Sequence, residues 1–118
     1  MTTIGHLRTP ETQARYEADL ASGKAGKLWD MPSLYEFNLF RIINNDYPHD
    51  KIAAVHHMLI PKRIVKHFYE LTLEELSEFL QIDRELSNKY HCIKRNYPAL
   101  ISVPEILHWH LYQLKEVI

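Results

Sequence analysis

Cysteine is almost absent from this sequence, which contains only Cys92. A single cysteine cannot form an internal disulfide bond, so a disulfide-stapled scaffold is excluded. The opening residues also lack the basic stretch and apolar run of a signal peptide. Together these absences predict a reducing, cytoplasmic setting.

Net charge and long apolar runs are missing as well. The formal net charge is −1, which gives no general attraction to nucleic acid or to an anionic membrane. No apolar stretch approaches the roughly 20 residues that span a bilayer. We therefore expect neither a nucleic acid nor a membrane partner, and any phosphate-bearing ligand must be small and locally bound.

What is present fits one soluble globular domain covering residues 1–118. Apolar residues make up 46% of the 118 positions and charged residues 25%, which is ordinary for such a domain. A chain of this length has room for one hydrophobic core. Residues 1–8 show no periodicity and are expected to form a loose N-terminal segment.

The first half of the chain predicts a helix and two strands. Thr9 followed by Pro10 is typical of a helix start, and Gly23 lies where that helix would end. Residues 34–43 are rich in aromatic and β-branched side chains and predict one strand. Residues 51–61 predict a second strand that ends at Pro61, and the two strands would pair antiparallel.

The second half predicts a long helix followed by two more strands. Thr72 and Glu75 have the spacing of a capping box, and apolar residues then follow the helical period until Asn96 and Pro98, with Cys92 late in the helix. Residues 99–104 and 106–114 predict one short and one longer strand. The fold class is therefore α+β, an antiparallel β-sheet with one long central helix and an N-terminal helix.

Histidines are numerous and fall in two tight groups on predicted strands. The chain has eight, with pairs at His56 and His57 and at His108 and His110. Because side chains alternate along a strand, His108 and His110 share one face, while only one member of the first pair can join them. Leu107, Trp109 and Leu111 occupy the opposite, core-facing side. Three histidines from two strands indicate a site.

The segments "HHMLIPKR", "YELTLEEL" and "SVPEILHWHL", in that order, resemble the histidine triad nucleotide-binding family. The resemblance runs from about Phe37 to Tyr112. It implies a HIT-like fold, a small-molecule nucleotide as partner, and cleavage or transfer at the α-phosphate of a nucleoside phosphate or dinucleoside polyphosphate. It implies no cofactor and no metal, and because family members often pair, it also implies a homodimer as one option.

The resemblance also assigns residue roles. His108 matches the nucleophile that forms a nucleotidyl-histidine intermediate, and His110 matches a donor that stabilises charge on the phosphoryl group and leaving atom. His56 matches a histidine beside the nucleophile. Asn45 resembles the residue that holds the ribose hydroxyls, and Ser102 resembles a serine that contacts the phosphate or leaving group.

One departure from the family pattern leaves alternatives open. Ile106 occupies the first position of the triad, where the family has a histidine. A catalytically weak nucleotide-binding or sensing module is therefore an alternative to an enzyme. A second alternative is a three-histidine metal site made by His56 or His57 with His108 and His110. Replacement of Ile106 by histidine is expected to be tolerated.

Overall fold

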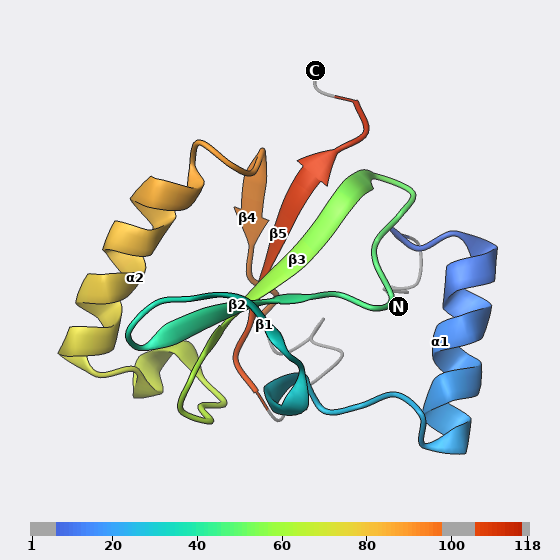
Figure 1. Ribbon diagram of the computed structural model, residues 1–118, viewed down its shortest axis with the longest axis horizontal. Coiled ribbons are helices and arrows are strands. Elements are labelled where there is room, and N and C mark those ends of the chain that lie inside the picture. Colours follow the sequence, from blue (N-terminus) through green and yellow to red (C-terminus); the bar gives the residue numbers. More distant parts are fainter. Residues whose placement is uncertain (1–6, 98–105, 117–118) are drawn as a thin grey trace.

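The structure is a computed structural model that describes residues 7–97 and 106–116. Its centre is a five-stranded antiparallel sheet with strand order β1-β2-β3-β5-β4, flanked by two helices (Figure 1). The elements are α1 (Pro10–Ser22), β1 (Ser33–Glu36), β2 (Phe40–Asn44), β3 (Ala53–Pro61), α2 (Leu73–Leu86), β4 (Cys92–Lys94) and β5 (Trp109–Leu114), with short 3-10 helices η2 (Leu28–Asp30) and η3 (Phe68–Glu70). The α+β class and the antiparallel sheet predicted from the sequence are confirmed.

Both helices begin where their capping residues predict. The Thr9 hydroxyl accepts a hydrogen bond from the Thr12 backbone N–H at 3.3 Å, and α1 stops at Gly23, whose φ of 79° favours glycine. In α2 the capping box is complete. Glu75 accepts from the Thr72 backbone N–H at 2.8 Å, and the Thr72 hydroxyl accepts from the Glu75 backbone N–H at 3.1 Å.

The predicted strand over residues 34–43 is wrong, because this segment folds back on itself. It forms β1 and β2, joined by a tight turn in which the Phe37 N–H donates to the Phe40 carbonyl at 2.9 Å. The α2 side chain of Glu78 accepts from the Leu39 backbone N–H at 2.7 Å and holds the turn. Strand propensity is the same on both sides of the turn, so composition alone did not reveal it.

The predicted long helix is also wrong beyond residue 86. α2 ends at Leu86, and Cys92 lies exposed on the edge strand β4. Tyr90 and Ile93 do pack against the core, as their spacing suggested, but they do so from the turn and from β4. The predicted strand over residues 99–104 lies outside the described residues.

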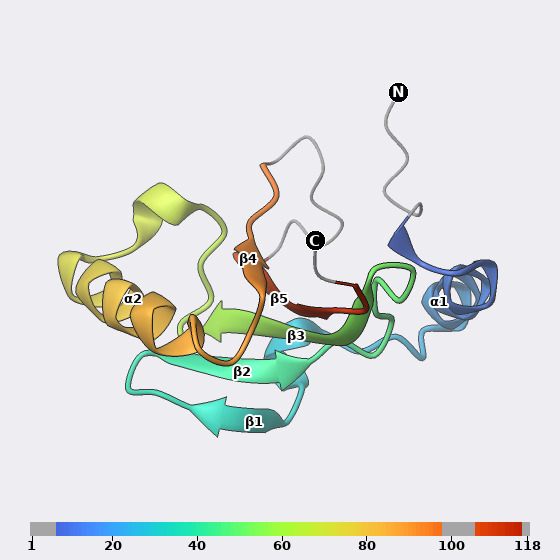
Figure 2. The ribbon, with the colours of Figure 1, turned by 90° about the horizontal axis from the view of Figure 1, so that it is seen from above.

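The sheet has two differently covered faces (Figure 2). One face packs against α2 and forms the main core, in which Trp109 stacks on Phe79 with ring centroids 4.5 Å apart. The other face carries a smaller apolar cluster of Ile43, Met58, Ile60 and Ile106, covered by the η2 segment. This second face also carries His56, His108 and His110, which are buried there, so α2 packs against the face of the sheet that does not hold them.

The end of the N-terminal segment is held in place. The Lys51 N–H donates to the Leu7 carbonyl at 3.0 Å, and Arg8, predicted to be part of a loose segment, is buried. Residues 1–6 lie outside the described part, so the loose terminus stays a prediction for them. No helix among the described residues is long and apolar enough to cross a membrane.

Candidate functional site

A buried cluster of aromatic rings lies on the sheet face opposite α2. β3 and β5 contribute His56, His110 and Tyr112, since His56 is paired with Tyr112 and Met58 with His110 in the strand register. His49 joins them from the loop between β2 and β3. Its ring centroid lies 4.5 Å from that of His56 and 5.1 Å from that of His110.

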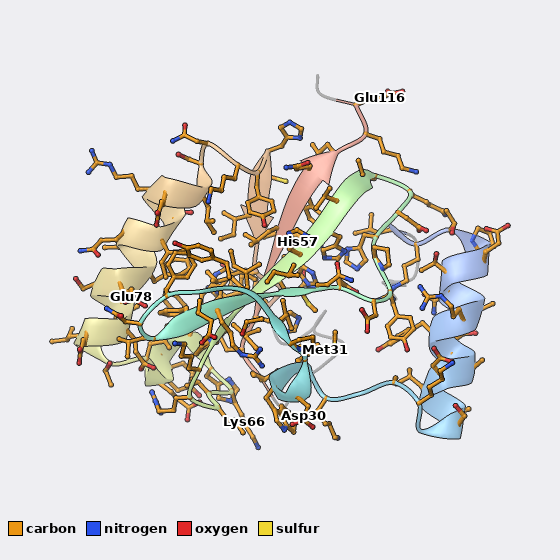
Figure 3. All side chains as sticks on the ribbon, in the orientation of Figure 1. Asp30, Met31, His57, Lys66, Glu78 and Glu116 are labelled. Carbon is orange, nitrogen blue, oxygen red and sulfur yellow. The ribbon has the colours of Figure 1, made fainter. Side chains whose placement is uncertain are left out.

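His57 points away from this cluster, as strand alternation predicts. Its Nδ1 lies 2.6 Å from the hydroxyl of Tyr90 on the α2 side of the sheet (labelled in Figure 3). The structure therefore brings His56, His108 and His110 to one face and separates His57 from them.

The hydrogen bonds of His56 determine where its proton lies. The His49 backbone N–H donates to Nδ1 of His56 at 2.9 Å, so this nitrogen holds a lone pair. In the neutral ring the proton is then on Nε2, which donates to Nδ1 of His110 at 2.8 Å. The Asn45 amide nitrogen, 3.3 Å from the same Nε2, is itself a donor, so this longer contact is not a hydrogen bond in that tautomer.

The same chain of bonds orients His110. Because its Nδ1 accepts from His56, neutral His110 carries its proton on Nε2. This Nε2 is buried and has no hydrogen-bond partner among the described residues. A buried donor without an acceptor is costly, so the position favours binding of an acceptor atom.

His108 has the opposite arrangement of its nitrogens. Its Nδ1 lies 3.0 Å from the Ile106 carbonyl, which can only accept, so Nδ1 carries the proton. Nε2 therefore holds the lone pair of the neutral ring. The ring centroids of His108 and His110 are 5.0 Å apart. The site therefore combines a ring with a lone pair on Nε2, that of His108, and a ring with a proton on Nε2, that of His110.

The environment keeps these rings neutral. Burial, together with the nearby charges of Arg8 and Lys94, lowers the pKa of His49 to about 3. Burial, followed by the neighbouring His49 and the same two cations, lowers the pKa of His56 to about 2. Burial also lowers the pKa of His108, and it lowers the pKa of His110 together with the neighbouring histidines. At neutral pH the lone pair on His108 is therefore available for attack.

A cavity of about 220 Å³ opens between α1 and this face of the sheet. Its sheet side includes Asn45, Met58, His108 and His110, and its other walls include residues of α1 and of the η2 segment. Met31, just after η2, is one of these (labelled in Figure 3). The cavity thus joins the two histidines to a partly apolar space that can accept a planar ring.

The remaining predicted positions have different outcomes. Asn45 lies in the cavity wall, where its Oδ1 accepts from the Tyr47 backbone N–H at 2.9 Å, and its ribose role stays a prediction. Ser102 lies outside the described residues. Ile106 is fully buried in the apolar cluster.

Two residues at the site were missed from the sequence. His49, whose Nδ1 lies 2.6 Å from the Tyr112 hydroxyl, stands in a turn-forming segment with no strand periodicity to place it. Arg8 lines the cavity and donates to the Tyr47 carbonyl at 2.7 Å. The only signal for His49 was the high number of histidines, and nothing in the sequence indicated Arg8.

The described residues hold one group of potential metal ligands, His49, His56 and His110, whose nitrogen atoms lie within 4.8 Å of one another. This is not the group predicted from the sequence, which included His108. Three neutral imidazoles bring no negative charge, and the positive charges of Arg8 and Lys94 already act on His49 and His56. Two of these nitrogens, Nε2 of His56 and Nδ1 of His110, are hydrogen-bonded to each other at 2.8 Å, so a metal ion held by all three rings would have to replace that bond.

Comparison with known proteins identifies solved structures with a similar fold, but no close relative in sequence. No protein-family model and no curated protein sequence matches the chain. Among solved structures, a protein described as "Hit Like Protein" superposes with a TM-score of 0.57 at 19% identity, covering 83% of this chain and 96% of its own.

Two further solved structures have the same fold. A HIT family hydrolase from Legionella pneumophila Philadelphia 1 superposes with a TM-score of 0.58 at 16% identity over 86% of this chain and 94% of its own. A histidine triad nucleotide-binding protein from Candida albicans superposes with a TM-score of 0.55 at 17% identity over 87% of this chain and 80% of its own. The chain therefore has the fold of the histidine triad proteins.

Proposed function

We propose that this protein binds a nucleotide and hydrolyses or transfers it at the α-phosphate, with His108 as the nucleophile. The observation that carries this proposal is the pairing of His108, whose Nε2 holds a lone pair, with His110, whose Nε2–H has no partner among the described residues, in the wall of one cavity. The fold shared with a nucleotide-binding histidine triad protein supports the choice of ligand.

The chemistry has two steps. Nε2 of His108 forms a bond to the α-phosphorus, and the bond from phosphorus to the leaving group breaks, with its electron pair departing on the leaving group. The Ile106 carbonyl accepts from Nδ1–H of His108 and stabilises the positive ring of the intermediate. Water or another acceptor then attacks phosphorus, the electron pair returns to Nε2, and the acceptor's proton is released to solvent.

His110 contributes a hydrogen bond rather than a charge. Its Nε2–H donates to a phosphoryl oxygen or to the leaving atom, whose negative charge grows in the transition state. His56 is a positioning residue in this scheme, because its own Nε2–H fixes the tautomer of His110. Asn45 lines the same cavity and is proposed to bind the ribose hydroxyls.

The decisive experiment traps the intermediate. Wild-type protein mixed with a nucleotide labelled at the α-phosphate and quenched rapidly should carry an acid-labile label on His108. His108→Ala should lose both the label and turnover, since the attacking atom is gone, while nucleotide affinity stays within about tenfold because most contacts lie elsewhere. His67→Ala, which changes an exposed histidine, is the matched control and should label normally. Turnover by His108→Ala would refute the mechanism.

A nucleotide-sensing module is the second candidate. It is favoured by one observation, that Ile106 fills the first triad position as a fully buried apolar residue and supplies no imidazole. A wild type that binds nucleotide with normal affinity but never becomes labelled would support sensing. The cytoplasmic setting and the homodimer stay predictions, and light scattering in solution checks the latter.

A further inference from the structure

Lys94 lies beside the histidines on the edge of the site away from the cavity. In the pairing of β4 with β5, Lys94 stands directly opposite His110, so the two side chains share one face of the sheet. The Lys94 ammonium lies 5.7 Å from the centroid of the Tyr112 ring, which is on the same face. β4 is the edge strand, as Figure 2 shows.

No carboxylate of residues 7–97 and 106–116 forms an ion pair with Lys94. Among the described residues the only ion pairs within 4.0 Å are Lys62 with Glu36 and Arg63 with Glu75. The side chain is half-buried, and burial lowers its pKa. A half-buried ammonium is costly where the described part of the chain supplies no counter-ion, so this position favours an anionic ligand group.

The strand order places Lys94 and the cavity on opposite sides of His110. At the level of His110 the residues across the sheet are Ile43, Met58, His110 and Lys94, from β2 to β4. Met58 lines the cavity on one side, whereas Lys94 lies on the other. A nucleoside in the cavity with its α-phosphate at His108 and His110 therefore leaves the Lys94 side for the departing group.

The hydrogen bonds of the cluster restrict what that departing group can be. His110 is neutral and its Nδ1 already accepts from His56, whose other nitrogen accepts from a backbone N–H. If His110 gave up its Nε2 proton, the chain of rings would have to carry a negative charge. The histidine rings can donate a hydrogen bond to the leaving group but have no proton to transfer to it, so a group that departs as a stable anion suits them best.

We propose that Lys94 binds the phosphate that departs, so that the substrates are nucleoside polyphosphates or dinucleoside polyphosphates rather than nucleoside phosphoramidates with an amine leaving group. This inference rests on the proposed function of His108. The bond from Nε2 of His108 to the α-phosphorus forms, and the bond from this phosphorus to the bridging oxygen breaks. The electron pair stays on that oxygen, in a terminal phosphate whose added charge Lys94 stabilises without a proton transfer.

The test compares two substrates that share the same nucleoside. In Lys94→Met, kcat/KM for a dinucleoside triphosphate should fall about 30-fold or more, the size of effect of losing one charge-assisted contact to a developing anion. For the p-nitrophenyl ester of the same nucleoside monophosphate, whose leaving group departs as a stable anion without a phosphate, kcat/KM should change less than about threefold, and Lys94→Arg should retain most polyphosphate activity. Equal losses with both substrates, or no loss with either, would overturn the proposal.

Lys89→Met is the matched control. Like Lys94, Lys89 has an ammonium near a tyrosine ring, 5.3 Å from the centroid of Tyr35. Unlike Lys94, it is exposed, and it does not line the cavity. It should leave both activities unchanged. Thermal unfolding of each variant establishes that the fold is retained.

A binding measurement separates this inference from the proposed function. Wild type should bind α,β-methylene ADP at least about tenfold more tightly than AMP, and Lys94→Met should bind the two alike, a difference of roughly 1.4 kcal/mol. If wild type binds AMP and α,β-methylene ADP equally, the role of Lys94 is refuted while nucleotide binding stands. If wild type neither binds nor cleaves any of these nucleotides, the proposed function is refuted and the inference with it.

Discussion

Mild acid should destabilise this protein because its buried histidines cannot accept protons while folded. The pKa of His49 is lowered to about 3 and that of His56 to about 2, both chiefly by burial, from an ordinary value of 6.5. The unfolded chain therefore binds more protons than the folded chain below pH 6.5. The stability due to these two rings is fully present above pH 6.5 and is lost progressively as the pH falls toward the folded values.

Between pH 6.5 and about pH 4, the folded rings stay neutral, so the loss of unfolding free energy depends only on the pKa of the unfolded histidine. At pH 5 a histidine that stays neutral in the folded state, and titrates near 6.5 when unfolded, lowers the free energy of unfolding by roughly 2 kcal/mol. His49 and His56 together give about 4 kcal/mol, a large part of the 5–15 kcal/mol typical of a domain. Burial also lowers the pKa of His108 and His110, which acts in the same direction.

Urea unfolding followed between pH 7.5 and pH 5 measures this loss directly. Lowered carboxyl pKa values, such as those of Asp50 and Glu75, exert their main effect below pH 5 and leave this window to the histidines. In His49→Gln the loss between the two pH values should be smaller than in wild type by roughly 2 kcal/mol, since one buried ring is gone. A wild-type stability that stays constant or rises on acidification, or a variant with the wild-type slope, would refute the reasoning.

Two further substitutions probe the site. His110→Ala should slow turnover of a nucleotide substrate by about 100-fold or more, because it removes the Nε2–H donor proposed to bind the phosphoryl group, and steady-state kinetics with His67→Ala as control measure this. Ile106→His, which the sequence suggested would be tolerated, should lower the free energy of unfolding by about 1–3 kcal/mol, because the position is fully buried among Ile43, Met58 and Ile60. Urea unfolding at pH 7.5 checks this, and an unchanged midpoint would contradict it.

The strand that carries the site could be predicted from the sequence because its two faces differ so strongly. Leu107, Trp109 and Leu111 alternate with the histidines and pack under α2, so a slip by one residue would expose the whole apolar row. The alternation therefore fixed which histidines share a face. It also correctly separated His56 from His57.

The errors came from segments whose pattern is compatible with two structures. Tyr90 and Ile93 continue the helical spacing of α2 and do contact the same core, but they reach it after the chain has turned at Ser87. The spacing of apolar residues indicates that a residue is buried, but it does not indicate whether a helix, a turn or a strand carries that residue. The tight turn between β1 and β2 was missed for the same reason, because Phe37 and Leu39 have strand-forming side chains on both sides of it.

The direction of the histidine hydrogen bonds depends on a contact that side-chain chemistry does not reveal. A backbone N–H, that of His49, donates to Nδ1 of His56 and thereby fixes the protons of His56 and His110. The loop between β2 and β3 makes this bond possible. It begins with the Asn45 N–H donating to the His56 carbonyl, and its later residue His49 then lies next to the His56 ring. Eight histidines in the sequence could indicate a metal site, an acid–base site or a nucleophile. The proposal of a nucleophile rests on what the structure adds, which is a lone pair on His108, an N–H on His110, and the charges of Arg8 and Lys94 near the neutral rings.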